Sequence, residues 1–291
     1  LGFYFTVDSP EFSCMSILIC PHCQYPLQLT ENRNYGCENN HQFDIAKEGY
    51  VNLLPVNQKK SKNPGDNDVM IAARRSFLEA GHYDPLVDEV VQLVCDQLNE
   101  KEEATLLDSG CGEGYYTNRI AEKLSVNNSQ VFGTDISKYA VRLAAKRYKT
   151  PNFFVSSVFN LPVAAKSVDF IVSIFAPFQA DEFQRVLAVN GKLLIVSPAE
   201  NHLKEIAELV YDEFRPHEKT ILDKVPEPFH QIAKKHCRFV LHLEGTNAIL
   251  NLLKMTPYYW SASEKQVANF EIIQQMEVTC DFNITVFEVV V

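Results

Sequence analysis

The chain has 291 residues, of which 46% are hydrophobic and 22% are charged, so it can bury a normal core and is not intrinsically disordered. Its formal net charge of -10 argues against a protein coated in basic surface for nucleic acid, although a local basic patch is compatible with that charge. No stretch approaches the roughly twenty consecutive apolar residues that span a bilayer.

The N-terminal residues lack the basic lead-in of a secretion signal, and Asp8 and Glu11 interrupt their apolar pattern. Met15 is a natural starting residue, so we expect residues 1–14 to be a leader added for expression. Without a secretion signal, the expected compartment is the reducing cytoplasm. Clustered cysteines in that compartment indicate metal ligands more readily than disulfides.

The first motif lies in a window rich in turn-forming residues. Cys20 and Cys23 form a C-x2-C pair, and the pattern continues as x13-Cys37-x3-His41. Three thiolates and one imidazole at this spacing form a closed tetrahedral set for zinc. A segment of about forty residues buries too little surface to fold alone, and bound zinc supplies folding free energy. We therefore expect a zinc module with a structural metal over residues 15–58, with ordinary buried cysteines or a redox C-x-x-C pair as the alternative.

A basic join follows, and we place a linker and helices over residues 59–102. The sequence starts turn-rich and becomes helical from about Asp66 or Asn67, either of which is a good N-cap. The positive charges of the join are candidates for RNA phosphate contacts, with a solvated linker and helix face as the alternative. These cations are Lys59, Lys60, Lys62, Arg74 and Arg75.

The second motif is a glycine-rich turn between a buried strand and a helix. The apolar run Ala104–Leu107 leads into D-S-G-C-G-E-G, and an amphipathic helical pattern follows. This order opens a doubly wound α/β domain, and D-x-G-C-G-x-G resembles motif I of class I S-adenosylmethionine (SAM)-dependent methyltransferases. A dinucleotide-binding fold for NAD is the alternative. The motif supplies the first cofactor-binding candidates: Asp108, Gly110, Gly112 and Gly114.

The next strand, Q-V-F-G-T-D, ends at Asp135, which lies 21 residues beyond Gly114. An acid at that position can accept hydrogen bonds from both ribose hydroxyls of a bound adenosine. Many relatives carry an Asp beside the adenine after the third strand, and Ser157 holds that place here.

The remaining elements complete the same plan. We expect an α/β class I SAM-dependent methyltransferase domain, Rossmann-like with a seven-stranded sheet, over residues 103–291. The pattern predicts strands at 152–163 (with its loop), 167–178, 191–198 and 236–245, helices at 181–189, 202–214 and 246–255, and a closing antiparallel strand pair at 276–291. Residues 220–236 give no clear pattern.

The strand expected over 167–178 ends in F-A-P-F, where many amino-group methylases carry N/D-P-P-Y/F. Ala176 replaces the polar side chain, which indicates a different target atom. The ring of Phe178 is the candidate contact for a target base, with burial in the core as the alternative. The sequence identifies no catalytic base, since Asp169 lies inside the strand and Asp181 is a weak candidate.

Taken together, the chain after Met15 resembles the bacterial 23S rRNA guanine-N1 methyltransferases, a family that includes a tylosin-resistance branch. The resemblance is carried by the zinc ligands and by stretches in the same order: H-Q-F-D-I-A-K-E-G-Y-V-N-L-L-P, N-P-G-D, A-R-R-S-F-L-E-A-G-H-Y, L-D-S-G-C-G-E-G-Y-Y-T and M-T-P-Y-Y-W.

The resemblance implies that the zinc module helps to recognise a 23S rRNA hairpin and that the larger domain binds SAM and methylates N1 of one guanine. It implies a homodimer whose paired zinc modules and catalytic domains line an RNA-sized cleft. It also implies cofactor contacts from Tyr83, the Gly112-Glu113 turn and His202. The rival hypotheses are a methyltransferase for a small molecule or a protein, and a non-catalytic RNA-binding factor with a vestigial SAM fold.

Overall fold

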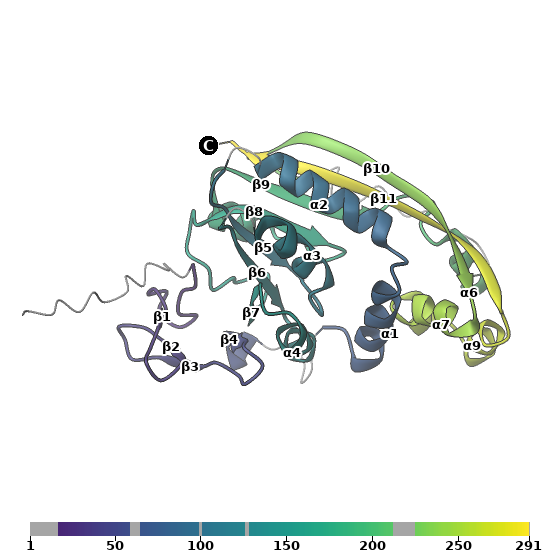
Figure 1. Ribbon diagram of the computed structural model, residues 1–291, viewed down its shortest axis with the longest axis horizontal. Helices are drawn as coiled ribbons and strands as arrows, with labels where there is room; N and C mark the ends of the chain where they lie inside the picture. The colour runs from purple at the N-terminus through teal and green to yellow at the C-terminus, as the bar shows by residue number, and fades with distance from the viewer. Residues whose placement is uncertain (1–16, 59–64, 99–100, 126–127, 212–224, 291) are drawn as a thin grey trace, which may run out of the picture.

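The computed structural model describes residues 17–58, 65–98, 101–125, 128–211 and 225–290 (Figure 1). The expected leader, 1–14, lies outside the described residues, and so do Lys59, Lys60 and Lys62 of the basic join. The same holds for the end of the helix expected over 202–214 and for the first part of the region 220–236.

An eight-stranded mixed sheet forms the frame of the molecule, in the order β10-β11-β9-β8-β5-β6-β7-β4 (Figure 1). Strands β4 to β9 pair in parallel, whereas β11 is antiparallel to both β9 and β10. The strands are β4 (Val51–Asn52), β5 (Thr105–Ser109), β6 (Gln130–Asp135), β7 (Asn152–Val155), β8 (Val168–Ile174), β9 (Leu187–Pro198), β10 (Phe229–Glu244) and β11 (Gln275–Val289). Strand order reverses at β5, so ligands are expected at the carboxyl ends of β5 and its neighbours.

The expected Rossmann-like methyltransferase sheet is present as β5 to β11, and the eighth strand comes from the zinc module. Strand β4 pairs in parallel with β7, with Val51 opposite Phe154. A two-residue strand carries too little pattern to be recognised in a sequence. The zinc module and the larger domain therefore share one sheet.

Two expectations about the later elements are corrected. The helix expected over 181–189 is α5 (Ala180–Val186), and β9 begins at Leu187 because the chain turns extended there and pairs with Val168. In place of the strand pair expected over 276–291, the structure has the single strand β11 (Gln275–Val289), which bonds to β9 on one side and β10 on the other.

Helices cover both faces of the sheet and extend beyond one end of it (Figure 1). They are α1 (Asp68–Glu79), α2 (Asp84–Leu98), α3 (Tyr115–Leu124), α4 (Lys138–Arg147), α5, α6 (Lys204–Val210), α7 (Thr246–Lys254), α8 (Tyr258–Ser261) and α9 (Glu264–Phe270), with a 3-10 turn at Val56–Gln58. Asn67 caps α1 as expected, since its side chain accepts a hydrogen bond from the backbone N–H of Met70 at 2.9 Å.

Alternation along the strands divides the core between the two faces. Leu106 packs in a cluster with residues of α2 and α3, whereas the next residue, Leu107, packs in a cluster with residues of α5. Leu18 and Leu27 of the zinc module are buried in the second cluster. The backbone N–H of Ile19 also donates to the carbonyl of Pro162 at 2.9 Å, so the module is docked on the sheet by both packing and hydrogen bonds.

None of the helices in the described ranges combines the length and the apolar character needed to cross a bilayer.

Candidate metal centre and cofactor-binding site

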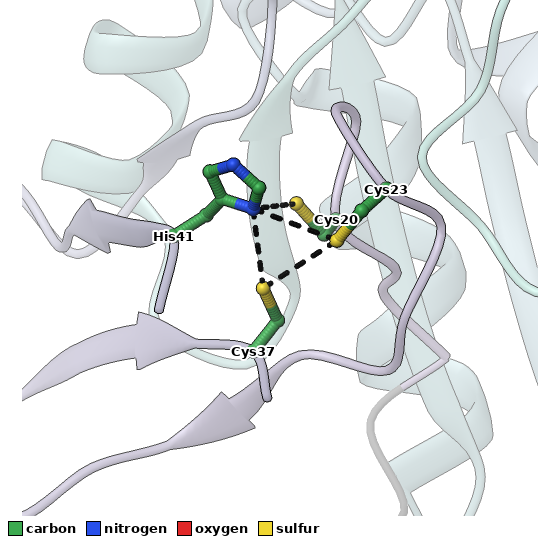
Figure 2. Close-up of side chains that lie close together, drawn as sticks. All are labelled: Cys20, Cys23, Cys37 and His41. Carbon is green, nitrogen blue, oxygen red and sulfur yellow. Dashed lines mark hydrogen bonds between the residues drawn. The ribbon is translucent and has the colours of Figure 1, made fainter. Parts of the chain in front are cut away.

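Four side chains of the zinc module converge on one point (Figure 2). The Nδ1 atom of His41 lies 3.6 Å from Sγ of Cys20, and 3.5 Å from Sγ of Cys23 and Cys37. The sulfurs of Cys23 and Cys37 are 3.6 Å apart. Local turns set this geometry: the N–H of Gln24 bonds back to the carbonyl of Cys20, and the two later ligands lie on the turn that connects β2 (Asn34–Gly36) to β3 (Gln42–Asp44) of a small sheet with β1 (Gln28–Leu29).

These separations fit a zinc ion. Metal bonds of ordinary length in a tetrahedron place a sulfur and an imidazole nitrogen about 3.6 Å apart and two sulfurs about 3.8 Å apart. Three thiolates and one imidazole complete the coordination, so the set provides a structural metal with no open position for a substrate. The predicted ligands Cys20, Cys23, Cys37 and His41 are therefore the ones that the fold brings together.

The three glycines of the loop between β5 and α3 all have positive φ, at 85° for Gly110, 55° for Gly112 and 85° for Gly114. A Cβ on Gly110 would lie 2.4 Å from Cβ of Ala176, and one on Gly114 would lie 2.9 Å from Cβ of Ala144. A Cβ on Gly112 would meet only Nη1 of Arg74 at 3.9 Å. Gly110 and Gly114 are thus required for packing, whereas Gly112 faces the open side of the loop.

Two carboxylates support this loop. Asp135, at the end of β6, accepts hydrogen bonds from the backbone N–H of Gly112 at 3.0 Å and of Ser137 at 2.8 Å. Burial raises its pKa, and these two N–H donors oppose that rise. Asp108 is almost fully buried and accepts from the hydroxyl of Thr117 at 2.6 Å. Burial raises the pKa of Asp108 to about 7, against the lowering effect of that hydrogen bond. The acid of β5 therefore ties α3 to the strand, and the acid of β6 holds the loop.

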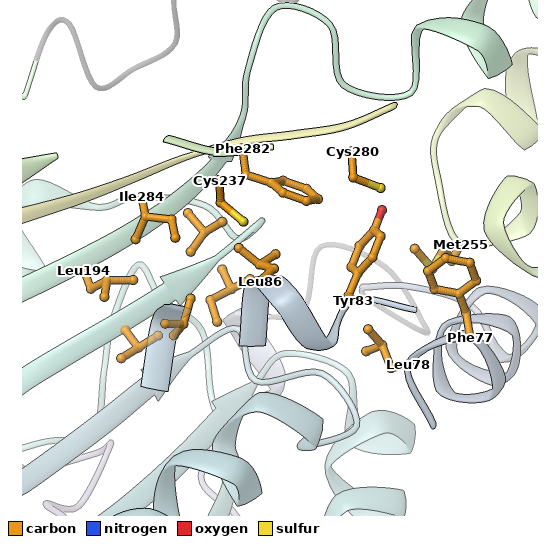
Figure 3. Packing of buried hydrophobic residues seen from close by; sticks show 14 of the residues in the cluster. Phe77, Leu78, Tyr83, Leu86, Leu194, Cys237, Met255, Cys280, Phe282 and Ile284 are labelled. Atoms are coloured by element: carbon orange, nitrogen blue, oxygen red, sulfur yellow. The ribbon is translucent and has the colours of Figure 1, made fainter. Parts of the chain in front are cut away.

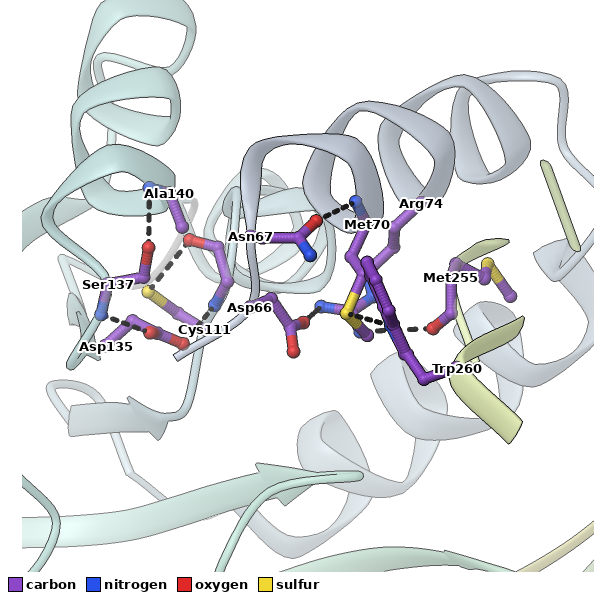
Figure 4. A network of polar contacts seen from close by, with 11 residues as sticks. Asp66, Asn67, Met70, Arg74, Cys111, Asp135, Ser137, Ala140, Met255 and Trp260 are labelled. Carbon is purple, nitrogen blue, oxygen red and sulfur yellow. Dashed lines mark hydrogen bonds and ion pairs between the residues drawn. The ribbon is translucent and has the colours of Figure 1, made fainter. Parts of the chain in front are cut away.

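The start of α1 lies over the same loop (Figure 4). Arg74 forms an ion pair with Asp66, and its Nη2 donates to the carbonyl of Met255 at 3.5 Å. A Cβ on Gly65 would lie 3.1 Å from Cβ of Ser137, so the segment before α1 contacts the turn after β6. The sequence makes Arg74 a candidate for RNA phosphate or for a solvated helix face, and its place over the glycine loop becomes visible only in the fold.

Arg75 also has a partner within the chain, since its Nε donates to the carboxylate of Glu79 at 2.7 Å. Glu113, the non-glycine residue of the predicted cofactor turn, is 3% exposed. Burial raises its pKa to about 7, and the charge of Arg75 acts in the opposite direction. Glu113 is therefore a buried acid of the loop whose surroundings include the arginines of α1.

Tyr83 and His202 lie at the edge of the site, in an aromatic cluster around Phe282. The ring of Tyr83 meets that of Phe282 at 5.3 Å, and its hydroxyl points to the thiol of Cys280 (Figure 3). The ring of His202 lies 4.5 Å from that of Phe282, and its Nδ1 accepts a hydrogen bond from the N–H of Asp281 at 3.3 Å. The fold thus brings together two predicted cofactor contacts that are far apart in the sequence.

The turn after β8 connects this cluster to the glycine loop. Ala176 packs on Gly110, while the preceding residue, Phe175, reaches the rings of His202 and Phe282. When F-A-P-F (175–178) is aligned with N/D-P-P-Y/F, the first residue of the motif, which is polar, corresponds to Phe175. The expectation that Ala176 replaces the polar side chain is therefore corrected to Phe175. Phe178 is half-buried and packs against Phe183 and other residues of the core.

The comparisons with known proteins agree with both sites. The family model "RlmA, N-terminal", a zinc ribbon, matches residues 18–62, and the model "Methyltransferase domain" matches residues 106–194. The matched ranges contain all four metal ligands and the glycine loop.

Three relatives align over most of their length. The chain is 31% identical to a 23S rRNA (guanine(748)-N(1))-methyltransferase of Streptomyces fradiae, over 86% of this chain and 88% of that protein. It is 30% identical to a putative 23S rRNA (guanine-N(1)-)-methyltransferase of Bacillus subtilis, over 93% and 96%. A putative enzyme of the same description from Micromonospora griseorubida is 31% identical, over 84% and 86%. Because relatives at least 30% identical align with most of the chain, and because a zinc-ribbon model and a methyltransferase-domain model both match it, the chain belongs to the 23S rRNA (guanine-N1)-methyltransferase family.

Proposed function

We propose that the protein transfers a methyl group from SAM to N1 of one guanine in a 23S rRNA hairpin. One observation carries this proposal: β4 of the zinc module and β5, which leads into the glycine loop, belong to one sheet, in a chain that aligns with rRNA methyltransferases over 86% and 93% of its length. A small-molecule or protein methyltransferase needs the loop but has no evident use for a ribbon fixed to the sheet edge.

The chain offers a cofactor site with distinct ends. The carboxylate of Asp135 is held at the carboxyl end of β6, where a ribose would lie, and Gly112 offers backbone without a side chain. At the other end, Nδ1 of His202 accepts a hydrogen bond from the backbone N–H of Asp281, which orients the imidazole ring. Tyr83 and Glu113 complete the set of proposed contacts. Bound SAM supplies an electrophilic methyl group on its sulfonium.

Methylation at N1 makes two demands on the protein. N1 lies on the pairing edge, so the guanine must be unpaired or flipped out of a helix. N1 also carries a proton that must leave during transfer. Asp169 is not placed to accept it, because its carboxylate is bound to Lys101 and to the backbone N–H of Thr105. Asp169 is therefore not the acceptor of the N1 proton, and the roles that we assign to the described residues are orientation of the base and exclusion of water.

Recognition of the RNA is assigned to the zinc ribbon and the basic join, residues 15–58 and 59–102. Arg74 and Arg75 are bound to carboxylates, so Lys59, Lys60 and Lys62 become the leading phosphate contacts of the join. A cytoplasmic location is part of the proposal, because that is where a ribosomal RNA substrate would be met. A homodimer remains part of the proposal on family membership alone, and light scattering of the purified protein tests it directly.

Deproteinised 23S rRNA from a strain that lacks the gene, incubated with labelled SAM, tests the reaction. We expect label in the RNA and one new primer-extension stop at a guanine, because a methyl group at N1 blocks pairing. Gly112→Val is the matched control, and it should give neither label nor stop. Label without a stop would place the methyl group off the pairing edge, and an unlabelled RNA would favour the small-molecule or protein substrate.

A further inference from the structure

Phe175 is an aromatic residue that the proposed chemistry has not yet used. It follows β8 directly, at the carboxyl end of the sheet, and its side chain is 46% exposed. A single exposed apolar residue needs no explanation by itself. The position of Phe175 needs an explanation, because its neighbour Ala176 packs on Gly110 of the cofactor loop.

The backbone of Phe175 gives an independent indication. Its φ is 53°, in the left-handed region that residues with a Cβ rarely adopt. The surroundings hold this conformation: its N–H donates to the carbonyl of Val196 at 3.2 Å, and Ala176 is fixed on the glycine loop. Strain maintained by its surroundings beside a candidate site is a reason to look for a function.

The strained turn aims the ring at a fixed aromatic support. The ring of Phe175 lies 5.5 Å from that of Phe282 and 6.4 Å from that of His202, nearly parallel to the latter at 14°. His202 and Phe282 are buried, whereas about half of Phe175 remains open. A partly exposed aromatic ring with buried aromatic neighbours thus lies beside the turn that contacts the loop proposed to hold the methyl donor.

We propose that Phe175 is the platform on which the extruded guanine stacks for methylation, a role that rests on the proposed function. A purine ring stacks on an aromatic side chain without needing a polar partner. This placement favours Phe175 over Phe178, because the ring of Phe178 packs against Phe183 at 5.6 Å and Phe229 at 5.8 Å within the core. The polar side chain of the N/D-P-P-Y/F turn is replaced by a stacking surface.

The test compares Phe175→Gly, Phe175→Leu and Phe175→Tyr with the parent on 23S rRNA and on SAM. Glycine removes the ring and accepts the positive φ, so the variant should fold with a urea midpoint close to that of the parent. Its SAM dissociation constant should stay within about twofold, and kcat/KM for the RNA should fall about 5- to 150-fold, the range that corresponds to base–aromatic stacking. Leucine should be intermediate, and tyrosine should restore most of the activity.

Phe178→Leu is the matched control, since it makes the same substitution three residues later in the same turn. Phe178→Leu should lower the urea midpoint, because it removes a packed ring. Its effect on RNA methylation should be smaller than that of Phe175→Leu. The platform is refuted if Phe175→Gly methylates the RNA as well as an active parent, or if Phe178→Leu has the larger effect on kcat/KM. If the parent protein itself does not methylate the RNA, both the proposed function and the platform are refuted. That outcome is distinguishable from refutation of the platform alone, in which the parent is active.

Discussion

The contact between the glycine loop and the turn after β8 gives a sharp prediction about stability. Gly110 has a φ of 85°, and a Cβ there would lie 2.4 Å from Cβ of Ala176. Gly110→Ala therefore introduces two separate penalties, one from the backbone conformation and one from the collision. Ala176→Gly removes the second penalty and leaves the first.

The two penalties have different sizes. A residue with a Cβ in the left-handed region loses about 1–2 kcal/mol. Overpacking of a tight contact costs about 1–3 kcal/mol more. We expect Gly110→Ala to lower the free energy of unfolding by about 2–5 kcal/mol. The double variant Gly110→Ala/Ala176→Gly should recover the overpacking part, so the coupling free energy between the two sites should be about 1–3 kcal/mol.

Urea unfolding of the parent, both single variants and the double variant measures this coupling, and calorimetry with SAM measures its consequence for the loop. SAM affinity should fall in Gly110→Ala and recover in the double variant. A coupling free energy smaller than about 0.5 kcal/mol would mean that the loop does not rest on the turn after β8. That result would also remove the contact through Ala176 on which the proposed proximity of Phe175 to the cofactor loop depends.

Three other predictions address different parts of the site. Gly112→Val should abolish SAM binding in calorimetry while changing the urea midpoint less than Gly110→Ala, because its side chain points to the open side of the loop. Cys20→Ser should lose the zinc found by elemental analysis and unfold the ribbon, while Cys95→Ser on α2 should retain the metal. Burial raises the pKa of Asp108 from 3.8 to about 7, so its contribution to stability is present below the lower value and is lost as pH rises through the higher one. Asp108→Asn should therefore flatten the fall in unfolding free energy across that pH window, and a pH profile unchanged from the parent would contradict the assignment.

The metal centre and the glycine loop are predictable because their signals are local. The spacing of Cys20, Cys23, Cys37 and His41 follows from two tight turns that each aim two ligands at one point. The loop after β5 follows from a buried strand, three glycines and an amphipathic helix. Asn67 as an N-cap is equally local, since the hydrogen bond that it accepts comes from Met70, three residues later.

Features that depend on tertiary packing are not predictable in this way. Arg74 carries the same charge whether it faces RNA or lies over Gly112, and only the docking of α1 decides between them. Phe175 and Phe178 are two phenylalanines of one turn, and the sequence offers no reason to expose the first rather than the second. The difference arises because the positive φ of Phe175 turns its ring toward His202, while Phe178 enters the core beside Phe183.

The short strand β4 connects the zinc module to the sheet of the larger domain. Val51 and Asn52 pair with Phe154 and Val155 of β7, and Val155 pairs in turn with Asp135 at the end of β6. The backbone N–H of Leu53 also donates to the carbonyl of Val155 at 3.0 Å. Only one strand therefore separates the zinc module from the carboxylate that holds Gly112. Because register in a sheet is fixed from strand to strand, the pairing of β4 with β7 sets the position of this part of the zinc module relative to the cofactor loop. Under the proposed function, this shared sheet would align an RNA hairpin held by the ribbon with the methyl donor at the glycine loop.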